Sequence, residues 1–242
     1  TSLKVDLFSG KVFIEMVSTT ANVHQEWDRF IKELKSHFAR PVTARVITDA
    51  APYFTRSKNF DAVNASHGIV HVALPPFTQE LNPAERELQT LHRVCRANMV
   101  ESQAPNAAYG ECLHASTHVI NTMPYVAGAS LSRNEKYAGR LLPGQHARLR
   151  VWGCACYEHR DHGPRAPHLK PAKQLEPTSV LRLFVGYDPN GLGYRVAQMG
   201  TWQVHTTAHI AHWSESDYPC AARILRQPQF LSSEQAQRLD RS

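Results

Sequence analysis

The chain has 242 residues, 42% of them hydrophobic, which is enough to bury the core of one large or two small domains. Its net charge of +6 favours a polyanion such as DNA or RNA as a partner. No apolar run approaches the roughly 18 residues of a membrane-spanning helix, and the first residues lack a secretion signal, so no membrane partner is expected. Five scattered cysteines form no disulfide framework, which favours an intracellular location, nuclear or cytoplasmic.

The first third of the chain alternates short apolar runs of period two with segments of helical period. Pro41 and the pair Pro75-Pro76 mark two of the ends. We expect strands over residues 3–6, 11–16, 43–48 and 68–74 and helices over 22–38 and 57–66. This order of elements is typical of an α/β domain.

The stretch from Asn82 predicts a long helix with a carboxylate in its first turn. Asn82 is a good N-cap, Pro83 suits the first helical position, and Glu85 follows at the third. Apolar residues then recur at three- and four-residue steps, which is typical of a buried stripe: Ala84, Leu88, Leu91, Cys95 and Met99. Glu85 lies off that stripe, so its side chain is placed to bind a ligand.

Beyond this helix the pattern changes twice. A further helix is expected over 106–121, and the following stretch to residue 146 contains the prolines and glycines of a linker. Short strands with glycine turns then predict a small β-barrel, with strands over 149–157, 180–187, 193–199 and 202–205. The last residues are polar, and 232–239 could form one or two helical turns.

Five segments keep an order and a spacing that make them specific together, although each alone would be weak. They read Pro76-Phe77-Thr78-Gln79 with Ala84-Glu85-Arg86, His118-Val119-Ile120-Asn121-Thr122-Met123-Pro124, Leu149-Arg150-Val151-Trp152-Gly153-Cys154, Phe184-Val185-Gly186-Tyr187 and Gly193-Tyr194-Arg195-Val196. In this order they resemble the integrase of copia-type (Ty1/copia) retrotransposons, over roughly residues 3–215.

The resemblance implies a domain organisation. Residues 1–124 would be an integrase catalytic core of the ribonuclease H-like α/β fold, with a mixed sheet and without its first strand. Residues 125–146 would be a linker, 147–215 an SH3-like basic β-barrel and 216–242 a flexible tail. A fragment of a Pol polyprotein that binds DNA as a homo-oligomer is the expected context.

The resemblance also implies a metal site. Asp49, which ends a predicted strand, and Glu85 are separated by 35 residues, as catalytic carboxylates are in this superfamily. They would hold Mg²⁺ or Mn²⁺ in a two-metal site that cuts and joins DNA. The two carboxylates would then lie about 4 to 8 Å apart. The family needs a third carboxylate, the first catalytic Asp, which lies on its first strand. Asp6 resembles a residue that ends the family's second strand, so the first catalytic Asp is expected ahead of Thr1. The alternative is that Asp6 itself serves as that residue.

The loop after Asp49 departs from the family. Where the family has Asp-Asn-Gly-Gly-Glu, this chain has Asp49-Ala50-Ala51-Pro52-Tyr53. Pro52 restricts the loop and favours an extended backbone at Ala51. We therefore expect the activity of this chain to be impaired.

Basic residues mark the expected nucleic-acid interface. Between residues 140 and 182 eight Lys and Arg accompany three acidic residues, which favours contact with phosphates, although a solvated surface is the alternative. The candidates are Arg86 and Arg93 on the helix and Arg148, Arg150, Arg165 and Lys170 in the barrel.

Three other interpretations stay open. The chain could be a non-catalytic DNA- or RNA-binding remnant, or a DDE-type transposase, as Leu81-Asn82-Pro83-Ala84-Glu85-Arg86 suggests. Cys154 and Cys156 with His159 and His162 invite a zinc site. The two cysteines are only two residues apart on a predicted strand, so both are expected to face inward instead.

Overall fold

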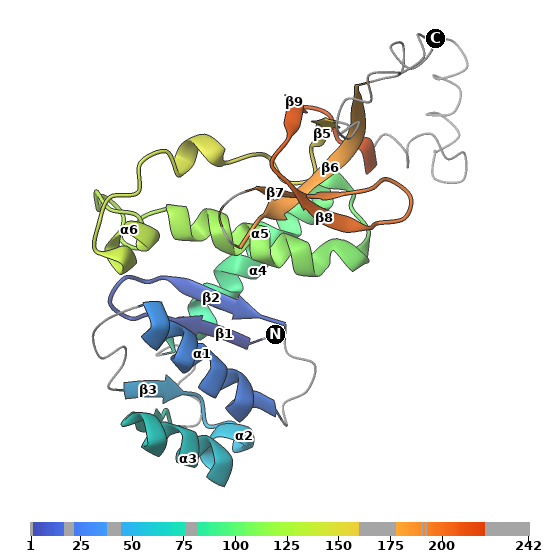
Figure 1. Cartoon of the computed structure of the whole chain (residues 1–242). Coiled ribbons are helices and arrows are strands. Elements are labelled where there is room, and N and C mark those ends of the chain that lie inside the picture. Colours follow the sequence, from blue (N-terminus) through green and yellow to red (C-terminus); the bar gives the residue numbers. More distant parts are fainter. Residues whose placement is uncertain are drawn as a thin grey trace, which may run out of the picture. The chain divides into compact units, whose positions relative to one another are not determined.

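The structure, a computed structural model, describes residues 2–16, 22–37, 45–75, 82–159, 178–189, 191 and 193–220 (Figure 1). The chain divides into two compact units, residues 1–90 and 91–242, and the boundary falls inside helix α4 (Pro83–Ser102). Within the described ranges, no helix is long and apolar enough to cross a membrane. The domain boundaries at 124 and 146 stay predictions.

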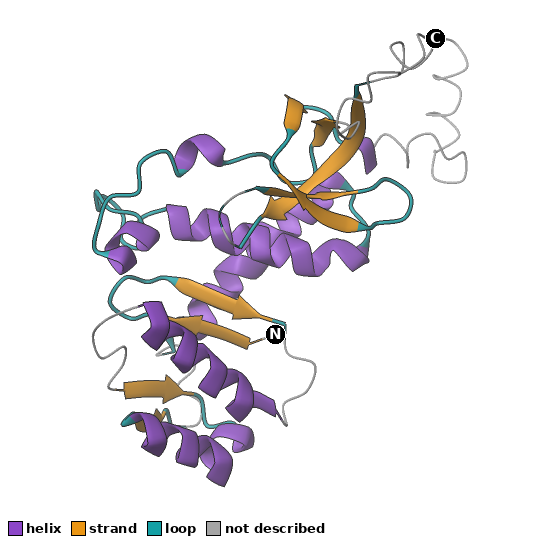
Figure 2. Cartoon of the chain, in the orientation of Figure 1, coloured by secondary structure: helices purple, strands orange, loops and turns teal. Residues whose placement is uncertain are grey.

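The first unit combines strands and helices, which confirms the predicted α/β class (Figure 2). Strands β1 (Ser2–Val5) and β2 (Val12–Glu15) form an antiparallel hairpin, and β3 (Arg45–Thr48) and β4 (Val70–Ala73) form a parallel pair. The helices of this unit, besides the start of α4, are α1 (Val23–His37), α2 (Pro52–Thr55) and α3 (Lys58–His67). All but α2 were predicted, within a few residues at their ends.

The core of the first unit joins α1, α3 and the hairpin. Ile31 and Phe60 are fully buried. The Trp27 indole N–H of α1 donates to Asn64 Oδ1 of α3 at 2.8 Å, and the Phe13 ring of β2 meets the Phe30 ring edge-on at 5.0 Å. These contacts connect α1 to the hairpin and to α3.

The second unit is built around an antiparallel sheet of five strands in the order β8-β7-β6-β5-β9. The strands are β5 (Ala155–His159), β6 (Ser179–Tyr187), β7 (Tyr194–Ala197), β8 (Val204–Thr207) and β9 (Ile210–Ser214). The unit also contains the C-terminal part of α4, α5 (Tyr109–Thr122), α6 (Arg133–Ala138) and 3₁₀ turns at Asn106–Ala108 and His146–Arg148.

The sheet must curl strongly, because β8 and β9 form its two edges yet only Ala208 and His209 join them. In a flat sheet four strand spacings would separate the edges by about 19 Å. Three Cα–Cα steps from Thr207 to Ile210 reach at most about 11 Å. The curl also brings side chains of β8 and β5 together, since His205 Nε2 of β8 lies 2.8 Å from Glu158 Oε1 of β5.

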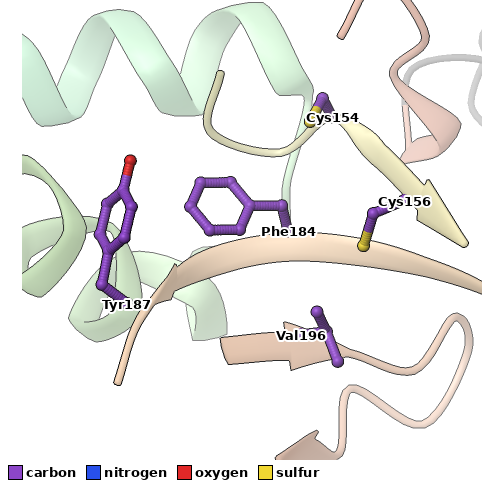
Figure 3. Close-up of a cluster of buried hydrophobic side chains, with 5 residues drawn as sticks. All are labelled: Cys154, Cys156, Phe184, Tyr187 and Val196. Atoms are coloured by element: carbon purple, nitrogen blue, oxygen red, sulfur yellow. The ribbon is translucent and has the colours of Figure 1, made fainter. Parts of the chain in front are cut away.

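Both faces of the central strand β6 are covered. Its last five residues, 183–187, are all buried. On one face lies a cluster of Cys154, Cys156, Phe184, Tyr187 and Val196 (Figure 3). Helix α5 is fastened to the sheet by Glu111, which accepts from Arg195 Nε at 2.7 Å and from Arg195 Nη2 at 2.5 Å. A strand segment buried on both faces reads as a continuous apolar run, as Leu183-Phe184-Val185 does in β6.

Several predicted bounds in the second unit were wrong. The stretch expected as a linker contains α6, which begins with a capping box of Ser132 and Glu135. Residues 149–154 precede β5 as a turn with Gly153 at φ +78°, so the first barrel strand starts at Ala155. Strand β9 was not predicted, and the helical turns expected over 232–239 lie outside the described residues.

Candidate active site and nucleic-acid interface

Glu85 lies where the sequence predicted it, in the first turn of α4. The helix begins at Pro83, and Asn82 Oδ1 accepts the Ala84 N–H at 3.0 Å, so Asn82 is the expected cap. Leu91 and Cys95 of the predicted stripe are fully buried. Glu85 itself is half-buried.

Asp49 is exposed and directly follows β3. Its Oδ1 accepts the Ala51 N–H at 3.3 Å, a long hydrogen bond. Ala51 has φ −61° and ψ 137°, the extended geometry predicted for a residue before Pro52. Helix α2 starts at Pro52. Burial raises the pKa of its Tyr53, and the negative charge of Asp49 raises this pKa further.

The backbone that carries Asp49 is anchored more firmly than its carboxylate. The Thr48 hydroxyl donates to the Asp49 carbonyl oxygen at 3.0 Å and lies 2.9 Å from His71 Nε2 of β4. The His71 ring packs edge-on against buried Phe60 at 5.1 Å. The end of β3 is therefore tied to the core of the first unit, while the Asp49 side chain projects from it.

Asp49 and the segment that leads to Glu85 leave the parallel pair at the same edge. Thr48 of β3 lies opposite Ala73 of β4, and the Leu74 N–H donates to the Thr48 carbonyl oxygen at 2.8 Å. Parallel strands present their carboxyl ends on one side. Residues 76–81 lie outside the described part of the chain, and the separation of 4 to 8 Å between the two carboxylates stays a prediction.

Asp6, the alternative third carboxylate, closes a hairpin turn. It follows β1, and its Oδ2 accepts the Ser9 N–H at 2.8 Å and the Ser9 hydroxyl at 2.5 Å. The Asp6 N–H in turn donates to the Lys11 carbonyl oxygen at 2.9 Å. Both of these bonds go to Oδ2, so they orient the Asp6 carboxylate toward its own turn.

The described residues do not bring together the three carboxylates that a two-metal site needs. Among the described residues, no three His, Cys, Asp or Glu gather in a group that could hold a metal ion. Asp49 and Glu85 remain as the predicted pair of ligands. The sequence contains a signal for the Asp6 turn, because Ser9 follows Asp6 by three residues and this Asp-x-x-Ser spacing favours a hydrogen bond between the two side chains.

The cysteines that suggested zinc are core residues. Cys154 and Cys156 are completely buried beside Phe184, so both face inward as predicted, although Cys154 lies just before β5 and not on it (Figure 3). Burial raises the pKa of each thiol to about 12, which disfavours the thiolate that zinc requires. His162 lies outside the described residues.

The basic candidates differ in their surroundings. Arg86 and Arg93 are exposed on α4. Arg148 donates to the carbonyl oxygens of Gly191 and Gly193, and Arg150 stacks over the ring of Trp213 at 5.2 Å. Arg165 and Lys170 lie outside the described residues. The ring contacts of Arg148 and Arg150 connect distant segments, so no local sequence signal indicated them.

Comparisons with known proteins give a consistent family. Residues 8–104 match the family described as DDE superfamily endonuclease. The chain is 26% identical over 179 residues, 73% of its length, to the retrovirus-related Pol polyprotein from transposon RE2 of Arabidopsis thaliana. It is 25% identical over 158 residues, 64% of its length, to the corresponding polyprotein from transposon RE1 of the same plant. The chain spans about a tenth of the length of these relatives.

Solved structures are also similar. One is the HTLV-2 integrase catalytic core domain in complex with magnesium, with 18% identity and a TM-score of 0.42, covering 54% of this chain and 79% of that one. Another is the simian T-cell lymphotropic virus intasome in complex with PP2A regulatory subunit B56 gamma, with 16% identity and a TM-score of 0.42, covering 88% and 73%. The family match and the Pol relatives confirm the predicted integrase-type core.

Proposed function

We propose that this chain, whose residues 8–104 match the DDE superfamily endonuclease family, is a nucleic-acid-binding protein derived from a retrotransposon integrase. Its family cuts and joins DNA. The observation that carries the proposal is the Asp6 carboxylate, which is engaged in a hairpin turn and leaves Asp49 and Glu85 as the candidate ligands. We infer that these 242 residues bind DNA but by themselves do not join DNA ends.

We infer a ribonuclease H-like core and an SH3-like barrel as the architecture behind this function. Support for the core comes from the antiparallel hairpin, the parallel pair β3–β4 and the family match. Support for the barrel comes from the five antiparallel strands whose edges are joined by two residues. A homo-oligomer in the nucleus or cytoplasm is the context that we propose.

In this proposal Asp49 and Glu85 hold a single Mg²⁺ or Mn²⁺ weakly. A bound divalent ion would act as a Lewis acid on a phosphate oxygen. The chain's own contribution is positional: Thr48 and His71 fix the backbone at Asp49, and Asn82 fixes the helix turn that carries Glu85. A two-ion mechanism needs a further bridging carboxylate, and the turn of Asp6 opposes that role.

A cut-and-paste transposase is the less favoured alternative. Both relatives named above are retrovirus-related Pol polyproteins, and one match spans 73% of this chain. A match of that extent favours a retrotransposon integrase over a transposase that shares only the catalytic core.

The proposal is tested by measuring the affinity for a 30-base-pair DNA duplex by fluorescence anisotropy at several salt concentrations. Reversal of four candidates to Glu in the second unit should weaken binding steeply and flatten the salt dependence. The four are Arg148, Arg150, Arg165 and Lys170. The matched control reverses four basic residues that are exposed in the first unit, Lys32, Arg45, Arg56 and Lys58.

Binding that survives in the control but not in the test variant supports an interface in the second unit. Equal losses in both variants mean that only the net charge matters. Unchanged binding and an unchanged salt slope in the test variant would overturn the proposed interface.

A further inference from the structure

Two arginines flank two adjacent aromatic rings of the curled sheet in the second unit. The row, called here the Arg–aromatic row, consists of Arg148, Tyr194, Trp213 and Arg150. The Arg148 guanidinium carbon lies 5.5 Å from the centre of the Tyr194 ring, the Tyr194 and Trp213 rings meet edge to face at 4.9 Å, and the Arg150 guanidinium carbon lies 5.2 Å from the centre of the Trp213 ring. Four neighbouring side chains from three segments therefore form one continuous surface.

The two rings of the row rest on the buried cluster drawn in Figure 3. Phe184 meets Tyr194 edge-on at 5.9 Å and Trp213 edge-on at 5.6 Å. Tyr194 and Trp213 are partly buried by this packing. Because Phe184 is completely buried between strands, the rings have a rigid base.

Backbone carbonyl groups hold the two guanidinium groups in place. Arg148 donates to the carbonyl oxygens of Gly191 and Gly193 at 2.5 and 3.3 Å. Arg150 donates from Nη1 to the carbonyl oxygens of Ala147 and Leu149 at 3.1 and 2.7 Å. A carbonyl group carries no full charge, so these bonds orient the arginines without neutralising them.

The charge of the row stays positive. Glu215 Oε1 lies 3.7 Å from Arg150 Nε, and the Glu215 side chain is 45% exposed, so this ion pair is weak. Two guanidinium groups thus accompany one solvated carboxylate. The surface combines fixed planar cations, aromatic rings and net positive charge, which is the combination that stacks on bases and attracts phosphates.

We propose that the Arg–aromatic row binds single-stranded nucleic acid by stacking bases on the guanidinium planes of Arg148 and Arg150. This inference rests on the proposed function and gives its substrate class. A guanidinium that carbonyl groups and a ring already hold in place loses little further freedom when a base stacks on it. A duplex keeps its base faces stacked inside, so the row distinguishes single strands from duplex DNA, which offers phosphates alone.

The test uses fluorescein-labelled dT12, U12 and a 12-base-pair duplex, and the variant Arg148→Lys/Arg150→Lys. Lysine keeps the charge but has no plane to stack. Loss of one base stack corresponds to about 1–3 kcal/mol, or about fivefold to 150-fold in affinity. We expect the affinity for dT12 or U12 to fall at least about fivefold, while duplex affinity and salt slope change less than about twofold. The matched control is Arg45→Lys/Arg56→Lys in the first unit, where both arginines are exposed.

A second measurement uses the unaltered chain, so that misfolding of a variant cannot hide the answer. Photocrosslinking of a single strand that contains 5-iodouracil should label peptides with Tyr194 or Trp213. Crosslinks confined to other segments would overturn the row, as would full single-strand affinity in the folded Lys variant. Tighter binding of dT12 than of U12, or the reverse, supports the row and identifies DNA or RNA as its ligand. A chain that binds duplex but neither single strand refutes this inference alone, whereas a chain that binds no nucleic acid refutes the proposed function.

Discussion

The predicted carboxylate ligand Asp49 and the predicted phosphate contacts Arg148 and Arg150 are held very differently. The Asp49 carboxylate accepts one hydrogen bond of 3.3 Å from its own loop, and it follows a four-residue strand whose partner β4 exposes Val70 and Val72. The two arginines donate to four backbone carbonyl groups and stack on rings over a buried cluster. The proposed binding surface is held by more contacts than the Asp49 carboxylate is, which is the difference we expect if the chain binds DNA without joining it.

The largest expected effect comes from the centre of the second unit. Phe184→Ala removes a completely buried ring that supports both Tyr194 and Trp213. We expect a loss of about 3–5 kcal/mol in the free energy of unfolding, measured by urea denaturation. Leu181→Ala on the same strand is the control, since Leu181 is 37% exposed and should cost about 1 kcal/mol. Equal losses would break the claim that β6 is the rigid base of the row.

Gly153 gives the next largest effect. A Cβ at Gly153 would lie 2.4 Å from Ser102 Cβ, and Ser102 is almost fully buried. Gly153→Ala should cost about 2–4 kcal/mol by overpacking and by its positive φ of +78°. Gly144→Ala is the matched control, because Gly144 has φ +79° with open space around it and should cost only about 1–2 kcal/mol. Thermal unfolding of both variants separates the clash from the backbone strain.

Asp6 sharpens the comparison in the first unit. Asp6→Ala removes the acceptor of two Ser9 hydrogen bonds and should cost about 1–2 kcal/mol. The affinity for Mn²⁺, measured by isothermal titration calorimetry, should stay unchanged because Asp6 serves its turn. Asp61→Ala, whose side chain is 62% exposed, is the control for stability. A marked loss of Mn²⁺ affinity in Asp6→Ala would make Asp6 a ligand.

The smallest expected effect is a loss of stability at low pH that involves Glu158 of β5. Burial alone would raise the pKa of Glu158, but hydrogen bonds from Arg182 and His205, both at 2.8 Å, outweigh burial and hold the pKa below its ordinary 4.5. The ionised carboxylate therefore stabilises the fold above about pH 4.5, and this contribution is lost as the pH falls through the lowered pKa.

Glu158→Gln should thus lower the free energy of unfolding by up to about 1 kcal/mol at pH 7. The difference from the unaltered chain should shrink toward pH 3 in thermal unfolding. Glu101→Gln, at an exposed position on α4, should show no such trend. A difference that grows as the pH falls has the wrong sign for a lowered pKa and would refute this role of Glu158.

Local signals made much of the fold predictable. The start of α4 followed from Asn82 and Pro83, and the extended backbone at Ala51 followed from Pro52, because capping and proline sterics act within a few residues. Helix α2 was missed because four residues are too few to show a period. Helix α6 was missed although its capping box, Ser132 with Glu135, is visible in the sequence.

The candidate sites were less predictable because their side chains depend on distant partners. The Gly191 carbonyl group that orients Arg148 lies 43 residues away along the chain, and the ring under Arg150 belongs to β9, a strand that was not predicted. The resemblance indicated which residues carry charge. It could not indicate that Arg148 and Arg150 contact aromatic rings and backbone carbonyl groups of distant segments.

The most direct test of the account is a strand-transfer assay, in which a short duplex end is joined into a plasmid with Mg²⁺ or Mn²⁺ present. The assay compares the unaltered chain with Glu85→Gln. The account predicts that both proteins bind the DNA and that neither joins it, because Asp49 and Glu85 lack the third carboxylate of a two-metal site. Robust joining by the unaltered chain that Glu85→Gln abolishes would contradict the account and would show that Asp6 completes an active site.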